Sequence, residues 1–236
     1  MFKNMKDIKE FDNKIRLEWG SPIIFDGIID IECYLETKPK ILWILKEGNE
    51  KNPNEDRNHR EFHQDVTVYK CWKSTYKKII LTTYGILYNY DYLPQQLNED
   101  ATMGKNHENV LLKIAFINVN KNGGKERAKR IRIEGSYTNH RKVLIEQIKE
   151  INPDVIINCS QIERLYDDIS SPVCYNLKKD KINSIAFSHN EEKLFINYYH
   201  PGCSSCPSAG IYTEDDYCSK LINIYRYWKN NFFCKL

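Results

Sequence analysis

The sequence lacks any apolar run long enough to cross a membrane. A membrane-spanning helix needs about 18 or more consecutive apolar residues, whereas the apolar run at residues 41–45 is far shorter and typical of a buried strand. The first residues, 1–7, also lack the apolar core of a signal peptide. We therefore expect a soluble, cytoplasmic protein with no membrane partner.

A disulfide framework and a complete set of metal ligands are also missing. The eight cysteines are scattered, and several lie in apolar stretches where a free thiol acts as a small hydrophobic side chain. Cys203 and Cys206 have the spacing of metal ligands, but a zinc or iron–sulfur site needs two further ligands and no second close pair exists. His59 and His63 do not form the zinc motif His-Glu-x-x-His. We expect no metal and no cofactor.

A strong net charge is the third absence. Lys and Arg number 35 against 32 Asp and Glu, a formal charge of +3, which neither requires nor excludes a nucleic-acid partner. The densest positive charge lies in a predicted loop, residues 120–132. Its candidate contacts to DNA phosphates are Lys121, Lys125, Arg127, Lys129 and Arg130. A solvated basic loop without a partner is the alternative interpretation.

What is present is an alternation of helix-like and strand-like segments, without internal repeats or low-complexity linkers. The pattern predicts an α/β protein: a three-layer α/β/α sandwich around a mostly parallel, four-stranded sheet. We expect a single domain over residues 1–236, in which residues 1–35 form an N-terminal helix and a connector. The predicted segments are helices at 2–19, 66–87, 139–151 and 214–230, strands at 41–45, 114–119 and 154–159, and a hairpin of 184–188 with 193–199.

Three of the predicted strands end in polar corners: residues 46–49 (Lys-Glu-Gly-Asn), residues 118–120 (Asn-Val-Asn) and residues 200–202 (His-Pro-Gly). In open α/β sheets, ligands bind at the carboxyl ends of the strands, so polar groups placed there are candidates for chemistry. For each corner alone, a solvated turn after an ordinary strand remains the alternative. Together they indicate one site.

In order and spacing, these corners resemble the motifs of the uracil-DNA glycosylase superfamily, over roughly residues 35–230. In that family, the first strand ends in a glycine-containing motif that positions the attacking water, a middle strand ends in an asparagine that recognises the base, and a late strand ends in His-Pro. This chain departs from the pattern. Its first motif does not open with glycine, and Gly202-Cys203 follows His-Pro where the family usually has serine.

The resemblance implies a role for each residue. Glu47 or Asn49 would orient the water, and Glu47 matches the branch of the family that has Gly-Glu here. Asn118 would recognise the base with its amide donor and acceptor, and His200 would stabilise negative charge on the departing base. Phe62 is the candidate for stacking beneath a base that has left the helix.

The predicted function is therefore that of a DNA glycosylase, an enzyme that hydrolyses the N-glycosidic bond of uracil or another modified base in DNA. Two alternatives remain open. One is a non-catalytic DNA- or nucleotide-binding module that keeps the glycosylase fold. The other is hydrolysis of free nucleotides, which predicts little salt dependence because few phosphates are engaged. We expect a monomer.

Overall fold

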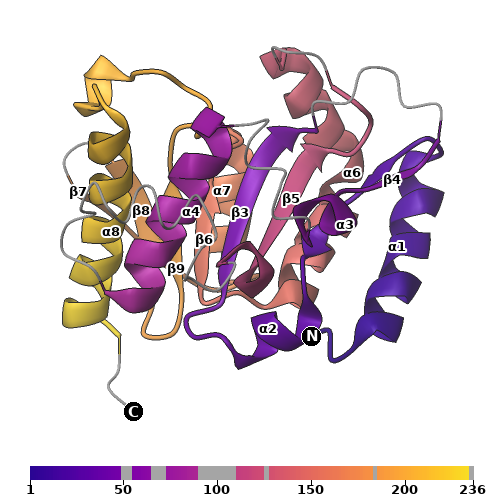
Figure 1. The fold of residues 1–236 in the computed structure, drawn as a ribbon, viewed down its shortest axis with the longest axis horizontal. Coiled ribbons are helices and arrows are strands. Elements are labelled where there is room, and N and C mark those ends of the chain that lie inside the picture. The colour runs from indigo at the N-terminus through magenta and orange to yellow at the C-terminus, as the bar shows by residue number, and fades with distance from the viewer. Residues whose placement is uncertain (49–54, 65–72, 90–109, 125–127, 183–184, 234–236) are drawn as a thin grey trace.

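The structure is a computed structural model that describes residues 1–48, 55–64, 73–89, 110–124, 128–182 and 185–233. Its centre is a seven-stranded sheet in the order β2-β5-β3-β6-β9-β8-β7 (Figure 1). The strands are β2 (Gly27–Ile28), β3 (Ile41–Glu47), β5 (Ile114–Asn120), β6 (Val155–Asn158), β7 (Lys178–Ile182), β8 (Ile185–His189) and β9 (Leu194–Asn197). A second, two-stranded parallel sheet pairs β1 (Ile24–Phe25) with β4 (Arg57–Asn58).

The α/β class is confirmed, but the predicted four-stranded sheet is wrong. Strands β5, β3, β6 and β9 are mutually parallel, as expected for strands linked by helical crossovers. The sheet continues beyond them at both edges through antiparallel pairs, β2 with β5 on one side and β9-β8-β7 on the other. The result is a seven-stranded mixed sheet.

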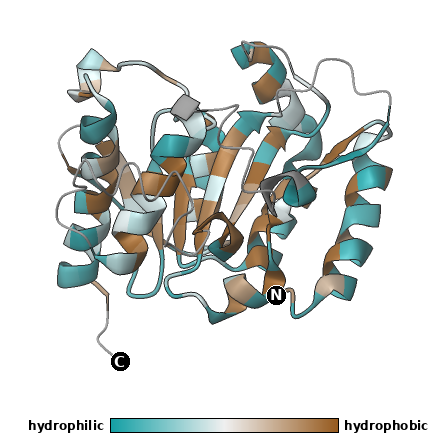
Figure 2. Ribbon diagram, in the orientation of Figure 1, coloured by the Kyte–Doolittle hydropathy of each residue, from teal (hydrophilic) through white to brown (hydrophobic). Residues whose placement is uncertain are grey.

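Helices pack on both faces of this sheet, because successive side chains of a strand point to opposite faces. Trp43 contributes to the core under α4 and α8, whereas its neighbour Ile44 contributes to the core under α1 and α6. Figure 2 shows the hydrophobic residues gathered along the central strands. The helices are α1 (Met5–Trp19), α2 (Ile31–Glu36), α3 (His59–Gln64), α4 (Lys73–Tyr88), α6 (Arg130–Ile151), α7 (Glu163–Ser170) and α8 (Glu214–Asn231), with 3-10 turns η2 (Val110–Lys113) and η3 (Pro207–Ala209).

The best-predicted helices have clear end signals. The Asn4 side chain accepts hydrogen bonds from the first turn of α1, and Gly20 ends that helix with φ 73°. Thr213 and Asp216 form a reciprocal capping box at the start of α8. Among the described residues, no helix is long and apolar enough to cross a membrane.

The helix predicted at 139–151 begins earlier, at Arg130, and has a kink at His140. Part of the predicted basic loop is therefore helical. Lys129 is the residue that precedes α6, and Arg130 lies in its first turn. The helix extends this far because Ile133 and Tyr137, four residues apart, are both buried against the sheet.

Candidate functional site

Three of the polar residues predicted to form the site lie at the carboxyl edge of the parallel strands. Glu47 ends β3, Asn118 and Asn120 lie at the end of β5, and His200 follows β9. In the register of the sheet, Leu45 lies opposite Asn118 and Glu47 lies opposite Asn120. Strand β6 separates β3 from β9, so their backbones lie about 10 Å apart.

Glu47 lies opposite Asn120 in the register of β3 and β5. Its Oε2 accepts a hydrogen bond of 3.1 Å from the Asn120 amide, and its Oε1 forms an ion pair with Arg132 from the first turns of α6. The Glu47 side chain is only 3% exposed. The carboxylate is thus fixed in orientation by an amide and a guanidinium.

Gly124 packs directly against Glu47, and its backbone N–H donates to the Gly48 carbonyl at 2.8 Å. A Cβ atom at position 124 would lie 2.6 Å from the Glu47 carboxyl carbon, which is closer than real Cβ contacts allow. Only glycine fits there, so the start of the predicted loop at residues 120–132 packs against the first motif.

Asn118 is 4% exposed and belongs to a buried polar group centred on Asp26. One Asp26 oxygen accepts the Asn118 backbone N–H at 2.7 Å and lies 3.4 Å from its Nδ2. Within the described residues, no hydrogen bond joins Glu47, Asn118 and His200 to one another. The neighbour Asn120, which sequence reasoning missed as a site residue, is the asparagine that contacts Glu47. The sequence could have indicated Asn120 as well, because Asn118 and Asn120 are two residues apart on a strand and therefore lie on one face.

Lys121 is a correction to the predicted phosphate contacts. Its Nζ donates to Asp26 Oδ1 at 2.6 Å, and both side chains have 0% exposure. Burial lowers the pKa of Lys121, which Asp26 opposes. A lysine enclosed in this way cannot contact DNA. We call this pair and the four buried or half-buried residues around it the Asp26 cluster: Asp12, Asp26, Arg60, Asn118, Lys121 and Gln147.

His200 has a defined hydrogen-bonding state. The backbone N–H of Gly202 donates to His200 Nδ1 at 3.1 Å, so Nδ1 carries no proton and the neutral ring holds its proton on Nε2. Burial, reinforced by the positive charges of Lys46 and Lys78, lowers the pKa of His200 to about 4. At neutral pH the ring is therefore uncharged, and its Nε2–H is a hydrogen-bond donor.

Lys46, at the end of β3, and Lys78, in α4, are the two cations whose charges act on His200. Lys78 reaches the turn that follows His200, in which the Cys203 N–H donates to the His200 carbonyl at 2.9 Å. The Lys46 ammonium donates to Gln161 Oε1 at 2.7 Å, and the Lys78 ammonium donates to the Cys203 carbonyl. The Lys78 ammonium also lies 5.0 Å from the centre of the Tyr217 ring. We call Lys46, Lys78, His200 and Cys203 the His200 cluster. Sequence reasoning missed both lysines as site residues.

The two cysteines with ligand-like spacing are free thiols. Cys206 Sγ donates to Cys203 Sγ at 3.4 Å, and burial is the main reason that the pKa of Cys206 rises to about 11. In the part of the chain that the structure describes, no group of three or more His, Cys, Asp or Glu side chains is arranged to hold a metal ion.

Of the other predicted site residues, only some are described by the structure. Asn49, Lys125 and Arg127 lie outside the described residues. Phe62 belongs to α3, but its side chain is likewise outside the description. Lys129 and Arg130 are exposed, and Arg130 pairs with Glu134 one helical turn along α6.

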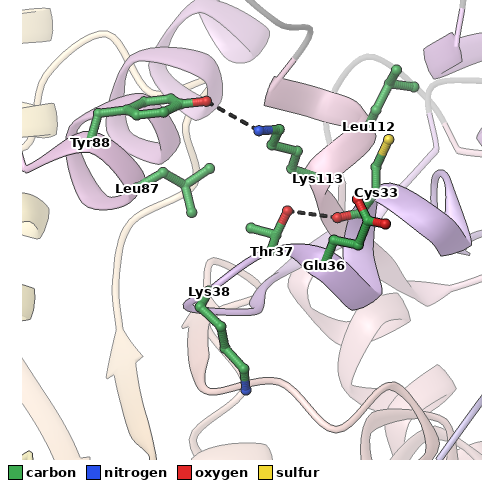
Figure 3. Close-up of a pocket in the computed structure, with 8 residues that line it drawn as sticks. All are labelled: Cys33, Glu36, Thr37, Lys38, Leu87, Tyr88, Leu112 and Lys113. Carbon is green, nitrogen blue, oxygen red and sulfur yellow. Dashed lines mark hydrogen bonds between the residues drawn. The ribbon is translucent and has the colours of Figure 1, made fainter.

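A pocket of about 530 Å³ lies at the opposite end of the strands, before β3 and β5 begin (Figure 3). None of the predicted site residues lines it. Its two lysines have partners within the protein: Lys38 pairs with Asp154 at 3.3 Å, and Lys113 donates to the Tyr88 hydroxyl at 3.2 Å. The lining residues are Cys33, Glu36, Thr37, Lys38, Leu87, Tyr88, Leu112 and Lys113.

No family model matches the chain, and neither a curated protein nor a solved structure matches it significantly.

Proposed function

We propose that this chain is a DNA glycosylase that hydrolyses the N-glycosidic bond of uracil or another modified base. The observation that supports this function best is the state of His200, a neutral imidazole whose Nε2–H is left to donate. Its position after β9 and the order of the three polar corners agree with the resemblance to the uracil-DNA glycosylase superfamily.

The chemistry requires such a donor. Cleavage of the bond between base and deoxyribose leaves negative charge on the departing base and positive charge on the sugar. A fixed N–H donor in a partly dry site stabilises that negative charge without reorganisation. The positive charges of Lys46 and Lys78 act in the same direction, because they favour an anion beside His200.

Glu47 supplies the second part of the proposal. Arg132 and Asn120 fix its carboxylate, and each carboxylate oxygen has a further lone pair that can accept a hydrogen bond from water. In this role Glu47 orients the attacking water, with Asn49 as the alternative group. Asn118 and Phe62 complete the proposal as the residues that recognise and stack on the base.

A non-catalytic module that binds DNA or a nucleotide is the second candidate. The burial of Glu47 favours it, because a carboxylate that is 3% exposed and paired with an arginine has little access to water. Such a module would keep the His200 cluster for binding and release no base. The basic residues Lys129 and Arg130 would serve either function.

Release of free base is the decisive measurement. Uracil-containing single- and double-stranded DNA would be incubated with the wild type and with His200→Ala, Glu47→Ala and Asn118→Ala. Loss of the His200 donor should slow release by roughly 100-fold, about 2.7 kcal/mol of transition-state stabilisation. His140→Ala is the matched control, because His140 stacks on Trp19 at the kink of α6.

The outcomes separate the two candidates. Base release that is equal in the wild type and in His200→Ala would contradict the glycosylase mechanism. DNA binding without release of uracil or of other modified bases would favour the non-catalytic module. Hydrolysis of free deoxyuridine monophosphate, but not of DNA, with little dependence on salt would favour a nucleotide hydrolase.

A further inference from the structure

Within the part of the chain that the structure describes, the two positive charges of the His200 cluster have no carboxylate partner. Among the described residues, no Asp or Glu oxygen lies within ion-pair distance of the Lys46 or Lys78 ammonium, and each donates instead to a neutral oxygen. Glu47 is next to Lys46 in sequence, but both of its oxygens are engaged by Arg132 and Asn120. Lys78 is nevertheless 95% buried, since its exposure is 5%.

Other cations near the same edge of the sheet have carboxylate partners. Lys121 pairs with Asp26, Arg60 with Asp12, and Arg132 with Glu47. Burying a charge without a counter-charge costs free energy, which an internal carboxylate commonly offsets. Beside His200 the described residues supply no such anion, so an anion from solution would offset this cost.

The donors favour a phosphate group over other anions. An ammonium has three N–H donors, of which the contacts to Gln161 and Cys203 use one each. The remaining ammonium donors and the Nε2–H of His200 can serve several oxygens at once, and phosphate offers more oxygens than a carboxylate or a halide. Ammonium groups bind phosphate strongly when they are shielded from water.

We propose that Lys46, Lys78 and His200 form a binding site for a phosphate group at the carboxyl edge of the sheet. This inference rests on the proposed function only in using the same histidine. Because His200 has a single Nε2–H donor, a phosphate and a base would bind it in turn, and the inference adds a ligand class to that site. The phosphate can belong to a free nucleotide or to the DNA backbone, which present the same chemistry.

The test follows the ring signals of His200 by NMR while inorganic phosphate is added at constant ionic strength. The expected result is a saturable shift, together with a rise in the His200 pKa because the bound anion favours the imidazolium. Lys46→Met and Lys78→Met should each weaken phosphate binding by about 10-fold or more. Lys78→Arg, which keeps the positive charge, should retain most of the affinity for phosphate. No saturable shift in the wild type would overturn the proposal.

Lys193→Met is the matched control. Lys193 is also half-buried and donates to neutral oxygens, of Asn152 and Pro153 at 3.0 and 2.7 Å, but it lies before β9 at the opposite end of the sheet. Phosphate binding should be unchanged in this variant. Equal weakening in Lys193→Met and in the site variants would also overturn the proposal. The loss of affinity would then follow from the lower net charge of the protein and not from a specific site.

Two further probes identify the source of the phosphate and keep the two hypotheses apart. Tighter binding of deoxyuridine monophosphate than of an oligothymidine would assign the site to nucleotides, and the reverse order would assign it to the DNA backbone. The binding assay involves no base release. A failed glycosylase assay with saturable phosphate binding would therefore refute only the function, and base release without phosphate binding would refute only this site.

Discussion

The Asp26 cluster and the His200 cluster lie at the same edge of one sheet, yet they handle buried charge in opposite ways. In the Asp26 cluster the central pair, Lys121 and Asp26, is fully buried and each charge has its partner inside the chain. In the His200 cluster, two lysines donate to neutral oxygens beside an uncharged histidine. In the first arrangement the two central charges neutralise each other inside the chain, whereas in the second the described residues supply no anion to the lysines.

This difference agrees with a structural role for the Asp26 cluster and with the binding role that we propose for the His200 cluster. The Asp26 cluster connects four parts of the fold. Asp12 lies in α1, Arg60 in α3 and Gln147 in α6, and Lys121 directly follows β5. Removing Lys121 or Arg60 would leave the carboxylate of Asp26 or Asp12, respectively, without its ion-pair partner. The His200 cluster holds its charges without such closure, which costs stability and is typical of binding and catalytic sites.

The largest expected effect on stability is that of replacing Lys121. Lys121→Met removes one partner of a fully buried ion pair and leaves the Asp26 carboxylate without its counter-charge. Unfolding in urea should show a loss of about 3–5 kcal/mol. Lys14→Met is the control, because the Lys14–Glu146 pair is exposed on the surface and should contribute less than about 1 kcal/mol. Similar losses in the two variants would remove the distinction between the clusters.

The second prediction concerns pH. The pKa of His200 is about 4 in the folded chain, against about 6.5 when unfolded. Between these values the unfolded state binds the proton and the folded state does not, so stability falls as pH drops from about 6.5 towards 4. The loss is at most about 1.4 kcal/mol per pH unit for one proton.

The His200→Gln variant isolates this effect. Carboxylates elsewhere in the chain titrate in the same range, so the useful quantity is the difference in unfolding free energy between wild type and variant at each pH. That difference should change between pH 6.5 and 4 and be constant above pH 7. A difference that stays constant throughout would show that the histidine is not held neutral by its surroundings.

Lys78→Met should have a smaller effect on stability, although Lys78 is almost as buried as Lys121. The substitution removes one hydrogen bond to the Cys203 carbonyl, worth about 1 kcal/mol, but it also removes an uncompensated buried charge. Urea unfolding should therefore show a loss of no more than about 1 kcal/mol. A loss as large as that of Lys121→Met would mean that Lys78 is a structural residue and would weaken the phosphate site.

Much of the fold was predictable because its central strands are apolar runs with clear ends. The runs in β3, β5 and β6 identify the parallel centre, and the hairpin of β8 and β9 is confirmed. The edge strand β7 was missed because its sequence, Lys-Lys-Asp-Lys-Ile, has almost no apolar signal and only its backbone pairs with β8. Strand β2 has only two residues, too few for any pattern.

The site was less predictable, because its contacts join residues far apart in the sequence. Nothing local distinguishes Lys121 from the lysines that follow it. The direction of its side chain is set by Asp26, which lies 95 positions earlier, directly before the edge strand β2. In the same way, the register of β3 and β5 decides that Asn120, rather than Asn118, faces Glu47. Register and long-range pairing emerge only when the sheet assembles.

The smallest expected effect extends the comparison to the surface of α6. Arg130 already has a partner in Glu134, whereas Lys129, exposed beside it, has none among the described residues. If both face DNA, Lys129→Ala should reduce the slope of log affinity against log salt by about 0.9, the value for one phosphate contact. Arg130→Ala should reduce the slope by less, because Glu134 already compensates part of its charge. Equal reductions would show that internal pairing does not decide which cations of this protein are available to a ligand.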